Sequence, residues 1–171
     1  MKKIFFCIFI YFFTFSSSIA ETPYFLDFKL ILNESVAGKK AQNFLKSKLD
    51  KGFKDINSKQ DKIVDEEKKI IQQKKIISGE EYKKKISKLR SDVSSLQKQR
   101  NKLLQSVATQ RAKAKAELLK ALNPIVKDYM KERKIRMVID KKNVLLADEN
   151  LDITKDIIGL LNKKLKSINL N

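Results

Sequence analysis

The sequence predicts an α+β protein, mostly α, in which a long antiparallel helical hairpin projects as a coiled-coil arm from a small head of strands and a helix. Two matched series of apolar residues repeat every seven positions, as the seam of a coiled coil requires. A Ser-Gly pair at positions 78 and 79 separates the series, and short β-branched stretches flank the helices. The arm is expected over residues 37 to 133, with its tip near residues 78 and 79, and the head over residues 21 to 36 and 134 to 171.

Residues 1 to 20 have the parts of a secretory signal peptide. Lys2 and Lys3 precede an apolar run that holds six of the ten phenylalanines of the chain, and small residues at Ser18 and Ala20 favour cleavage after Ala20. The apolar run is shorter than the ~20 residues of a spanning helix, so a membrane anchor is the less favoured alternative. The segment therefore predicts export.

After Ala20 the chain contains neither cysteine nor histidine. Disulfides, thiol catalysis and cysteine metal sites are thereby excluded, and so are Ser-His triads and most zinc sites. We therefore predict no catalytic residue, no metal ligand and no cofactor, and we do not expect an enzyme.

The positive charge of the chain is concentrated on the arm. The net charge of +18 falls to +16 without Lys2 and Lys3, and residues 39 to 133 hold 27 basic against 12 acidic side chains. Such a field attracts anionic partners such as acidic protein, membrane surfaces or nucleic acid. Export makes nucleic acid an unlikely partner.

The seam of the arm is predicted from positions that pair when the chain reverses at Gly79, because the numbers of facing residues then always sum to 159. Gly79 is expected to end the first helix in a left-handed conformation. Between these layers, polar residues such as Gln60 facing Arg100 and Glu67 facing Val93 are expected to make the arm easy to bend. The predicted seam residues are Ile56, Ile63, Ile70, Ile77, Tyr82, Leu89, Leu96 and Leu103.

The ends of the arm carry signals of their own. Residues 22 to 28 are expected to form a short strand, and Asn33 or Ser35 to cap the first helix. Pro124 removes a backbone N–H, so the second helix is expected to bend near Asn123, either as a hinge or as a static kink.

The C-terminal part of the head is predicted to contain two strands and a helix. Residues 135 to 140 and 144 to 148 are the expected strands, joined by a turn at residues 141 to 143. Thr154 is the expected N-cap of a last helix that packs on the strands through Ile157, Leu161 and Leu165.

A head of this size buries too little surface to be stable alone, so self-association is expected. Each candidate for the shared core could instead be buried within its own subunit, and taken singly that is the favoured alternative. The candidates are Phe25, Phe28, Val138, Ile139, Leu145 and Leu146.

Several short segments occur in an order that resembles the Skp/OmpH family of periplasmic chaperones. They are YFLDF at residues 24 to 28, ILNES at 31 to 35, AGKKA at 37 to 41, MVID at 137 to 140 and LDITKDII at 151 to 158. The resemblance implies a periplasmic homotrimer whose heads share a β-barrel-like body and whose arms surround a cavity. It implies that the cavity holds unfolded outer-membrane proteins without ATP, and that the protein has affinity for lipopolysaccharide or anionic phospholipid.

The favoured hypothesis is thus a holdase that binds unfolded outer-membrane proteins in a basic cavity and prevents their aggregation. The alternatives are a structural coiled-coil envelope protein that binds a folded partner and, less favoured, a basic nucleic-acid-binding protein. Taken singly, each lysine near the tip is more often part of a solvated face than a contact for client or anion. The candidate contacts are Lys68, Lys69, Lys74, Lys75, Lys83, Lys84 and Lys85.

Overall fold

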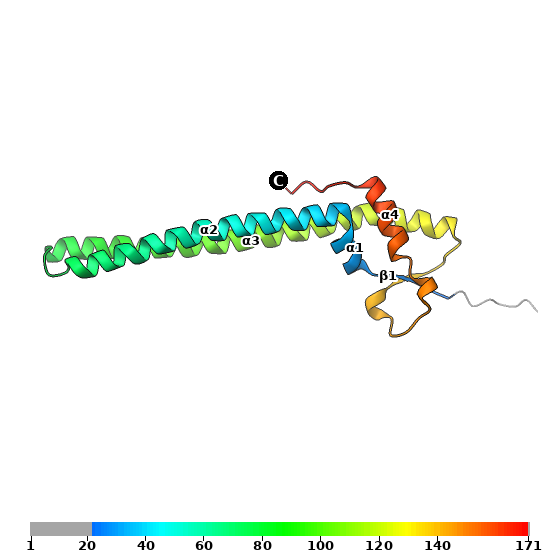
Figure 1. Cartoon of the computed structure of the whole chain (residues 1–171), viewed down its shortest axis with the longest axis horizontal. Helices are drawn as coiled ribbons and strands as arrows, with labels where there is room; N and C mark the ends of the chain where they lie inside the picture. The colour runs from blue at the N-terminus through cyan, green and yellow to red at the C-terminus, as the bar shows by residue number, and fades with distance from the viewer. Residues whose placement is uncertain (1–21, 171) are drawn as a thin grey trace, which may run out of the picture.

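Two long helices lie side by side and antiparallel, and a small head surrounds their base (Figure 1). The computed structural model describes residues 22 to 170, so the predicted signal peptide lies outside the described residues. Helix α2 spans Val36–Gln73 and α3 spans Gly79–Glu132. The predicted fold class is confirmed.

A serine side chain caps the N-terminus of each arm helix. Ser35 Oγ accepts from the backbone N–H of Gly38 at 3.2 Å, and Ser78 Oγ accepts from that of Glu81 at the same distance. Each bond satisfies one donor that a helix N-terminus leaves without an intrahelical partner. The acidic side chains of Glu80 and Glu81 in the first turn of α3 suit the positive end of its dipole.

The expected left-handed glycine at the arm tip is wrong. None of the glycines in residues 22 to 170 has a positive φ, and Gly79 is the first residue of α3. Helix α2 ends five residues before Ser78, and the N–H of Ile77 donates to Gln73 O at 3.1 Å to close the turn. The tip therefore depends on this turn and on the Ser78 cap.

Helix α3 ends in a left-handed residue that is a lysine. Lys134 has φ 57°, and the N–H of Ile135 donates to Met130 O at 2.8 Å. These are the features of a Schellman motif, in which an apolar residue just after the helix packs back on its last turns. Ile135 is accordingly buried. Upstream, α3 continues without interruption through the exposed Pro124.

The strands of the head differ from the prediction. Strand β1 (Tyr24–Leu26) pairs in parallel with β2 (Val138–Asp140), and on its other side the N–H of Ile153 donates to Phe25 O at 3.0 Å. Residues 135 to 137 and 144 to 148 are not strands. Two short 3-10 turns, η1 (Lys141–Asn143) and η2 (Glu149–Leu151), flank residues 144 to 148. Capping by Asp140 and Asp148 favours these turns over an extended hairpin.

Two further differences concern the head helices. Helix α1 (Phe28–Glu34) was not predicted; Asp27 caps it by accepting from the N–H of Leu30 at 2.8 Å. Helix α4 spans Thr154–Lys164, and the expected N-cap at Thr154 is wrong, because Thr154 is its first helical residue and donates its N–H to Asp152. Helix α4 packs mainly on α3 and α1 rather than on the strands.

The core of the head joins these elements to the base of the arm. Ile31 of α1 meets the buried stripe of α4, formed by Ile157 and Leu161. The last turns of α3 supply much of the same core, through Leu118, Leu122, Ile125 and Tyr129. The arm is thus anchored in the head by apolar packing. Among residues 22 to 170, no helix combines the length and the apolar character needed to cross a bilayer.

Candidate functional site

The eight predicted seam residues all lie buried or half-buried along the arm, with Ile56 and Ile70 the most enclosed. The side-chain contacts that the structure shows between α2 and α3 all have sums below the predicted 159, down to 153 for Phe53 and Arg100. Lys59 Nζ donates to Gln99 Oε1 at 2.5 Å, and these numbers sum to 158. Leu103 lies against Gly52, one turn away from its expected partner Ile56.

The polar positions expected between the seam layers are exposed. Gln60, Glu67 and Arg100 all face solvent in this chain. The guanidinium of Arg100 lies over the ring of Phe53, with 5.8 Å from its carbon to the ring centroid. The arm therefore excludes these polar groups from the seam.

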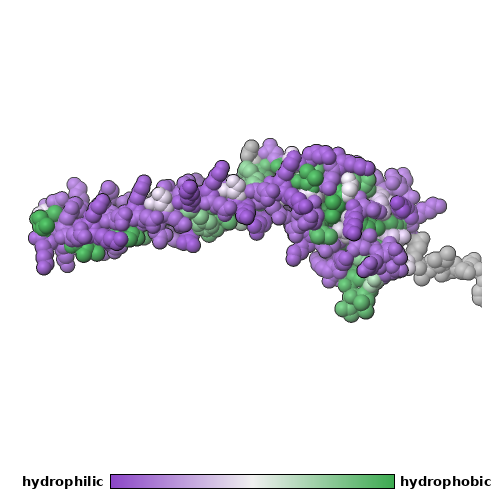
Figure 2. Space-filling view, viewed as in Figure 1, coloured by the Kyte–Doolittle hydropathy of each residue, from purple (hydrophilic) through white to green (hydrophobic). Residues whose placement is uncertain are grey.

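A set of exposed apolar side chains lies beside the seam, and sequence reasoning missed it. Figure 2 shows apolar surface along one edge of an otherwise polar arm. The sequence signal was available as apolar doublets such as Ile70-Ile71, because neighbours on a helix point about 100° apart and only one can enter a narrow seam. Ile70 is 1% exposed and Ile71 is 61% exposed. The set consists of Phe44, Val64, Ile71, Ile76, Val93 and Leu104.

The seven candidate lysines near the tip have three kinds of surroundings. Lys85 lies half-buried and donates to Gln73 Oε1 at 2.7 Å, and Lys74 Nζ lies 5.9 Å from the ring centroid of Tyr82. Lys68 Nζ lies 3.5 Å from Asp65 Oδ1. The first two brace the tip. The other four, Lys69, Lys75, Lys83 and Lys84, are exposed.

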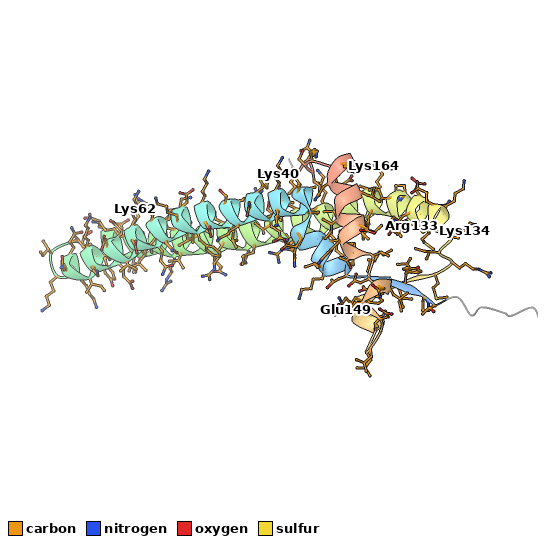
Figure 3. The ribbon with its side chains drawn as sticks, turned by 45° about the vertical axis from the view of Figure 1, so that its right-hand side comes forward. Lys40, Lys62, Arg133, Lys134, Glu149 and Lys164 are labelled. Atoms are coloured by element: carbon orange, nitrogen blue, oxygen red, sulfur yellow. The ribbon has the colours of Figure 1, made fainter. Side chains whose placement is uncertain are left out.

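Cationic side chains also project from the arm far from its tip. Figure 3 shows them along its length, for example at Lys40 and Lys62. Together with the apolar edge, they make the arm a mixed surface that offers positive charge and apolar contact side by side.

The candidate residues of the shared head core have different environments. Phe25 is buried, and Phe28, Val138 and Ile139 are half-buried. The alternative of burial within the same subunit is wrong for Leu145 and Leu146, which are 96% and 91% exposed.

Leu145 and Leu146 are exposed because residues 144 to 148 pair with no strand of the described chain. These two leucines are therefore left in solvent. Figure 2 shows an apolar projection on the surface of the head.

A polar network ties this part of the head together. Asp152 accepts from Lys141 Nζ at 2.7 Å and from the N–H and hydroxyl of Thr154. The hydroxyl of Thr154 in turn accepts from the N–H of Asp27 at 2.8 Å. Burial opposes ionisation of Asp152, but the hydrogen bonds from Lys141 and Thr154 outweigh it and lower the pKa of the carboxyl. The network joins the end of β1 to the start of α4.

Acid should weaken the head through Asp152. Because its folded-state pKa lies below the unfolded value, the stabilisation is present above the unfolded pKa, about 4, and is lost as the pH falls through the folded pKa. Asp152→Asn should therefore be less stable than the parent above about pH 5, and the difference should shrink as the pH falls below the unfolded pKa of about 4. Urea unfolding across this range measures it. Asp92→Asn, on the exposed arm, controls for net charge. If the difference in stability between Asp152→Asn and the parent were the same at all pH values, the lowered pKa of Asp152 would be contradicted.

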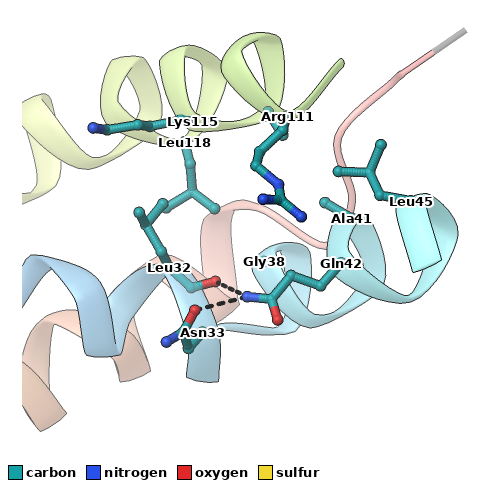
Figure 4. Close-up of a pocket in the computed structure, with 10 residues that line it drawn as sticks. Leu32, Asn33, Gly38, Ala41, Gln42, Leu45, Arg111, Lys115 and Leu118 are labelled. Atoms are coloured by element: carbon teal, nitrogen blue, oxygen red, sulfur yellow. Dashed lines mark hydrogen bonds between the residues drawn. The ribbon is translucent and has the colours of Figure 1, made fainter. Parts of the chain in front are cut away.

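A hollow of about 430 Å³ opens at the root of the arm, between α1, α2 and α3 (Figure 4). Its floor is apolar, and Arg111 and Lys115 stand at its rim. Gln42 closes one side by donating to Asn33 Oδ1 at 2.8 Å. Apolar floor residues are Leu32, Ala41, Leu45, Ala114 and Leu118. Within the described part of the chain, no group of His, Cys, Asp and Glu is arranged to hold a metal ion.

Comparison with known families agrees with this architecture. The sequence model of the family described as "Outer membrane protein (OmpH-like)" matches residues 24 to 161. The chain belongs to the OmpH-like family. This match confirms the resemblance inferred from the short segments in the head and at the mouth of the arm. No curated protein matches the OmpH-like chain.

The fold of this OmpH-like chain is also found in a solved structure. A Caulobacter crescentus protein assigned as an outer membrane chaperone (OmpH-like) superposes with a TM-score of 0.80 at 18% sequence identity. The match covers 86% of this chain and 89% of the other. At this identity the comparison establishes the shared fold.

Proposed function

We propose that this OmpH-like protein is an ATP-independent holdase chaperone of the periplasm. It binds unfolded outer-membrane proteins in a basic cavity between the arms of a homotrimer and prevents their aggregation. The observation that carries the proposal is the arm surface, where exposed apolar side chains such as Ile71 and Val93 stand among exposed lysines. Family membership and the chaperone assignment of the Caulobacter crescentus protein support it.

The arm surface suits a client that must be held without being folded. Burying one exposed aliphatic side chain contributes about 1.5 to 3 kcal/mol at most, so no single contact is tight. Several such contacts on one flexible client raise the overall affinity by avidity, while each can still dissociate rapidly. The cations add long-range attraction for acidic segments and slow the loss of a partly released client. Release then needs no nucleotide.

The trimer would use the head. Leu145 and Leu146 protrude from a head that is small for its core, and a second and third copy would cover them. Phe25, Phe28, Val138 and Ile139 lie in the same part of the head, around β1 and β2. The division into a signal peptide (1 to 20), a head (21 to 36 and 134 to 171) and an arm (37 to 133) belongs to this proposal.

The same cations would bind lipopolysaccharide or anionic phospholipid. Lys69, Lys75, Lys83 and Lys84 are exposed near the tip and are free to meet phosphate groups. Such binding would place the arms near the membrane into which the clients insert.

The test is dilution of a urea-denatured outer-membrane β-barrel protein with and without the purified chain, followed by light scattering. We expect suppression at a molar excess of trimer. Changing Val64, Ile71 and Val93 together to serine should raise the concentration needed for half-suppression by about threefold to tenfold.

The matched control changes Asn57, Gln72 and Gln105, which are also exposed, to serine and should have no effect. Unchanged aggregation at a molar excess of the parent protein would defeat the proposal. If the protein instead bound one folded envelope partner tightly, the structural coiled-coil alternative would be favoured.

A further inference from the structure

The last described residues fold back onto the arm. Helix α4 ends at Lys164, and residues 165 to 170 then run along the arm root on the side of the hairpin away from α1 (Figure 1). Leu170 is only 5% exposed and packs with Ala41, Leu45, Val107 and Ala114. A terminal segment without regular secondary structure is thus seated between α2 and α3.

The side chains of this tail alternate. Ser167 and Asn169 are exposed, whereas Ile168 is half-buried and Leu170 is buried. An extended chain places alternate side chains on opposite faces, so one face of the tail meets the arm and the other meets solvent. The apolar contacts come from the inward face, at positions two residues apart.

One side-chain amide holds the backbone of the tail. Gln110 Nε2 donates to the carbonyl oxygen of Leu170 at 2.6 Å. Gln110 Oε1 accepts from Lys48 Nζ at 2.9 Å, and the same ammonium donates to Ser106 Oγ at 2.9 Å. Lys48 therefore fixes the orientation of the amide, so that its NH₂ group faces the tail. A donor aimed at a main-chain carbonyl recognises any residue at that position.

We propose that this groove, formed by Ala41, Leu45, Val107, Gln110 and Ala114, binds extended polypeptide segments with apolar residues at alternate positions. The tail of the chain is its resident occupant, and a segment of an unfolded client displaces it. The proposal rests on the proposed function, because it assigns to the holdase a site for its client. Recognition through a backbone carbonyl and small apolar pockets suits clients of varied sequence.

The tail is suited to displacement. Leu170 is its one buried side chain, Leu165 and Ile168 are half-buried, and the amide of Gln110 holds the carbonyl of Leu170. A short tether gives it an effective concentration on the order of millimolar, so it competes well with a short free peptide. A long client that also contacts the arm surface gains avidity and can replace it. The groove is therefore covered at rest and opens to multivalent clients.

The test compares the parent chain with Leu170→Ser, using methyl NMR signals of Leu45, Val107 and Ala114. The probe is a synthetic peptide with the sequence of residues 165 to 171. It should bind Leu170→Ser at least fivefold more tightly than the parent, since the resident tail no longer competes. A variant that ends at Lys166 should behave in the same way. Gln110→Glu, added to Leu170→Ser, keeps the size of the side chain but removes the NH₂ donor and should weaken binding about fivefold.

Two outcomes would overturn the proposal. One is equal affinity of the peptide for the parent and both tail variants, including no binding to any of them. The other is equal binding of a peptide of the same composition with its apolar residues adjacent. The peptide titration uses no client. If the peptide fails to bind as expected while the protein still suppresses client aggregation, only the proposed groove is contradicted and the holdase function is not. Peptide binding without suppression would remove the holdase.

Discussion

Replacing Gly38 with alanine should destabilise the protein by about 3 kcal/mol, at the upper end of the range for overpacked sites. A Cβ on this buried residue would lie 2.0 Å from the carbonyl oxygen of Leu32 and 2.8 Å from Ser35 Oγ. The first atom belongs to the backbone of α1, and the second caps α2 through its bond to the N–H of Gly38. The carbonyl cannot move without shifting α1 away from the start of the arm, and Ser35 Oγ can rotate away only by losing the cap of α2. Urea unfolding followed by circular dichroism measures the loss.

Gly159→Ala provides the matched control. Gly159 lies exposed within α4, and a Cβ there would meet no heavy atom within 4 Å. Alanine costs less backbone entropy than glycine in a helix, so this variant should be more stable by about 0.5 to 1 kcal/mol. The change in the free energy of unfolding for Gly52→Ala should lie between those of the other two variants, because the added Cβ would meet the mobile methyl groups of Leu103. Equal effects at positions 38 and 159 would contradict the close approach of α1 to α2.

Ile70→Ala should lower the free energy of unfolding of the arm by about 2 to 4 kcal/mol, whereas Ile71→Ala should change it by less than about 0.5 kcal/mol. The two neighbours have the same side chain, but Ile70 is 1% exposed and Ile71 is 61% exposed. Truncating Ile70 leaves a cavity in a seam only one side chain wide. Hydrogen exchange of the outer halves of α2 and α3 should report the loss locally.

The same pair separates stability from binding. Under the proposed function, Ile71→Ala should weaken the suppression of client aggregation although the arm remains folded. Ile70→Ala should act on binding only through the loss of arm structure. If both variants had the same stability, the assignment of one residue to the seam and the other to the surface would be wrong.

Apolar residues of the arm are divided between the buried seam and the exposed surface, so the same helices can pair with each other and still offer apolar contacts. Heptad spacing commits one member of each apolar doublet to the seam and leaves its neighbour in solvent. Dense lysines around the exposed members oppose self-association of the arms through like charge. Under the proposed function, a client with few positive charges would meet no such repulsion.

The sequence alone determined the arm, because its signals are local. A seven-residue repeat specifies a helix and its apolar face within a few turns. Ser35 was one of two expected caps of the first helix, whereas the Ser78 cap of the second helix was not predicted. Helices α2 and α3 form the predicted hairpin, but the last turns of α3 lie in the core of the head, so the boundary of the arm at residue 133 stays a prediction. The seam residues could be named for the same reason, although the facing register departs from 159 by one at Lys59 and Gln99 and by four at Gly52 and Leu103.

Only the tertiary structure decided the arrangement of the head and the tail. Which segment pairs with β1, whether residues 144 to 148 extend, and where Leu170 packs all depend on neighbours that are distant in sequence. Short segments such as β2 have no periodicity long enough to select a partner, so competing turns and distant contacts choose their conformation. The arm was predictable because its contacts repeat along the chain, whereas the head was not, because each of its contacts occurs once.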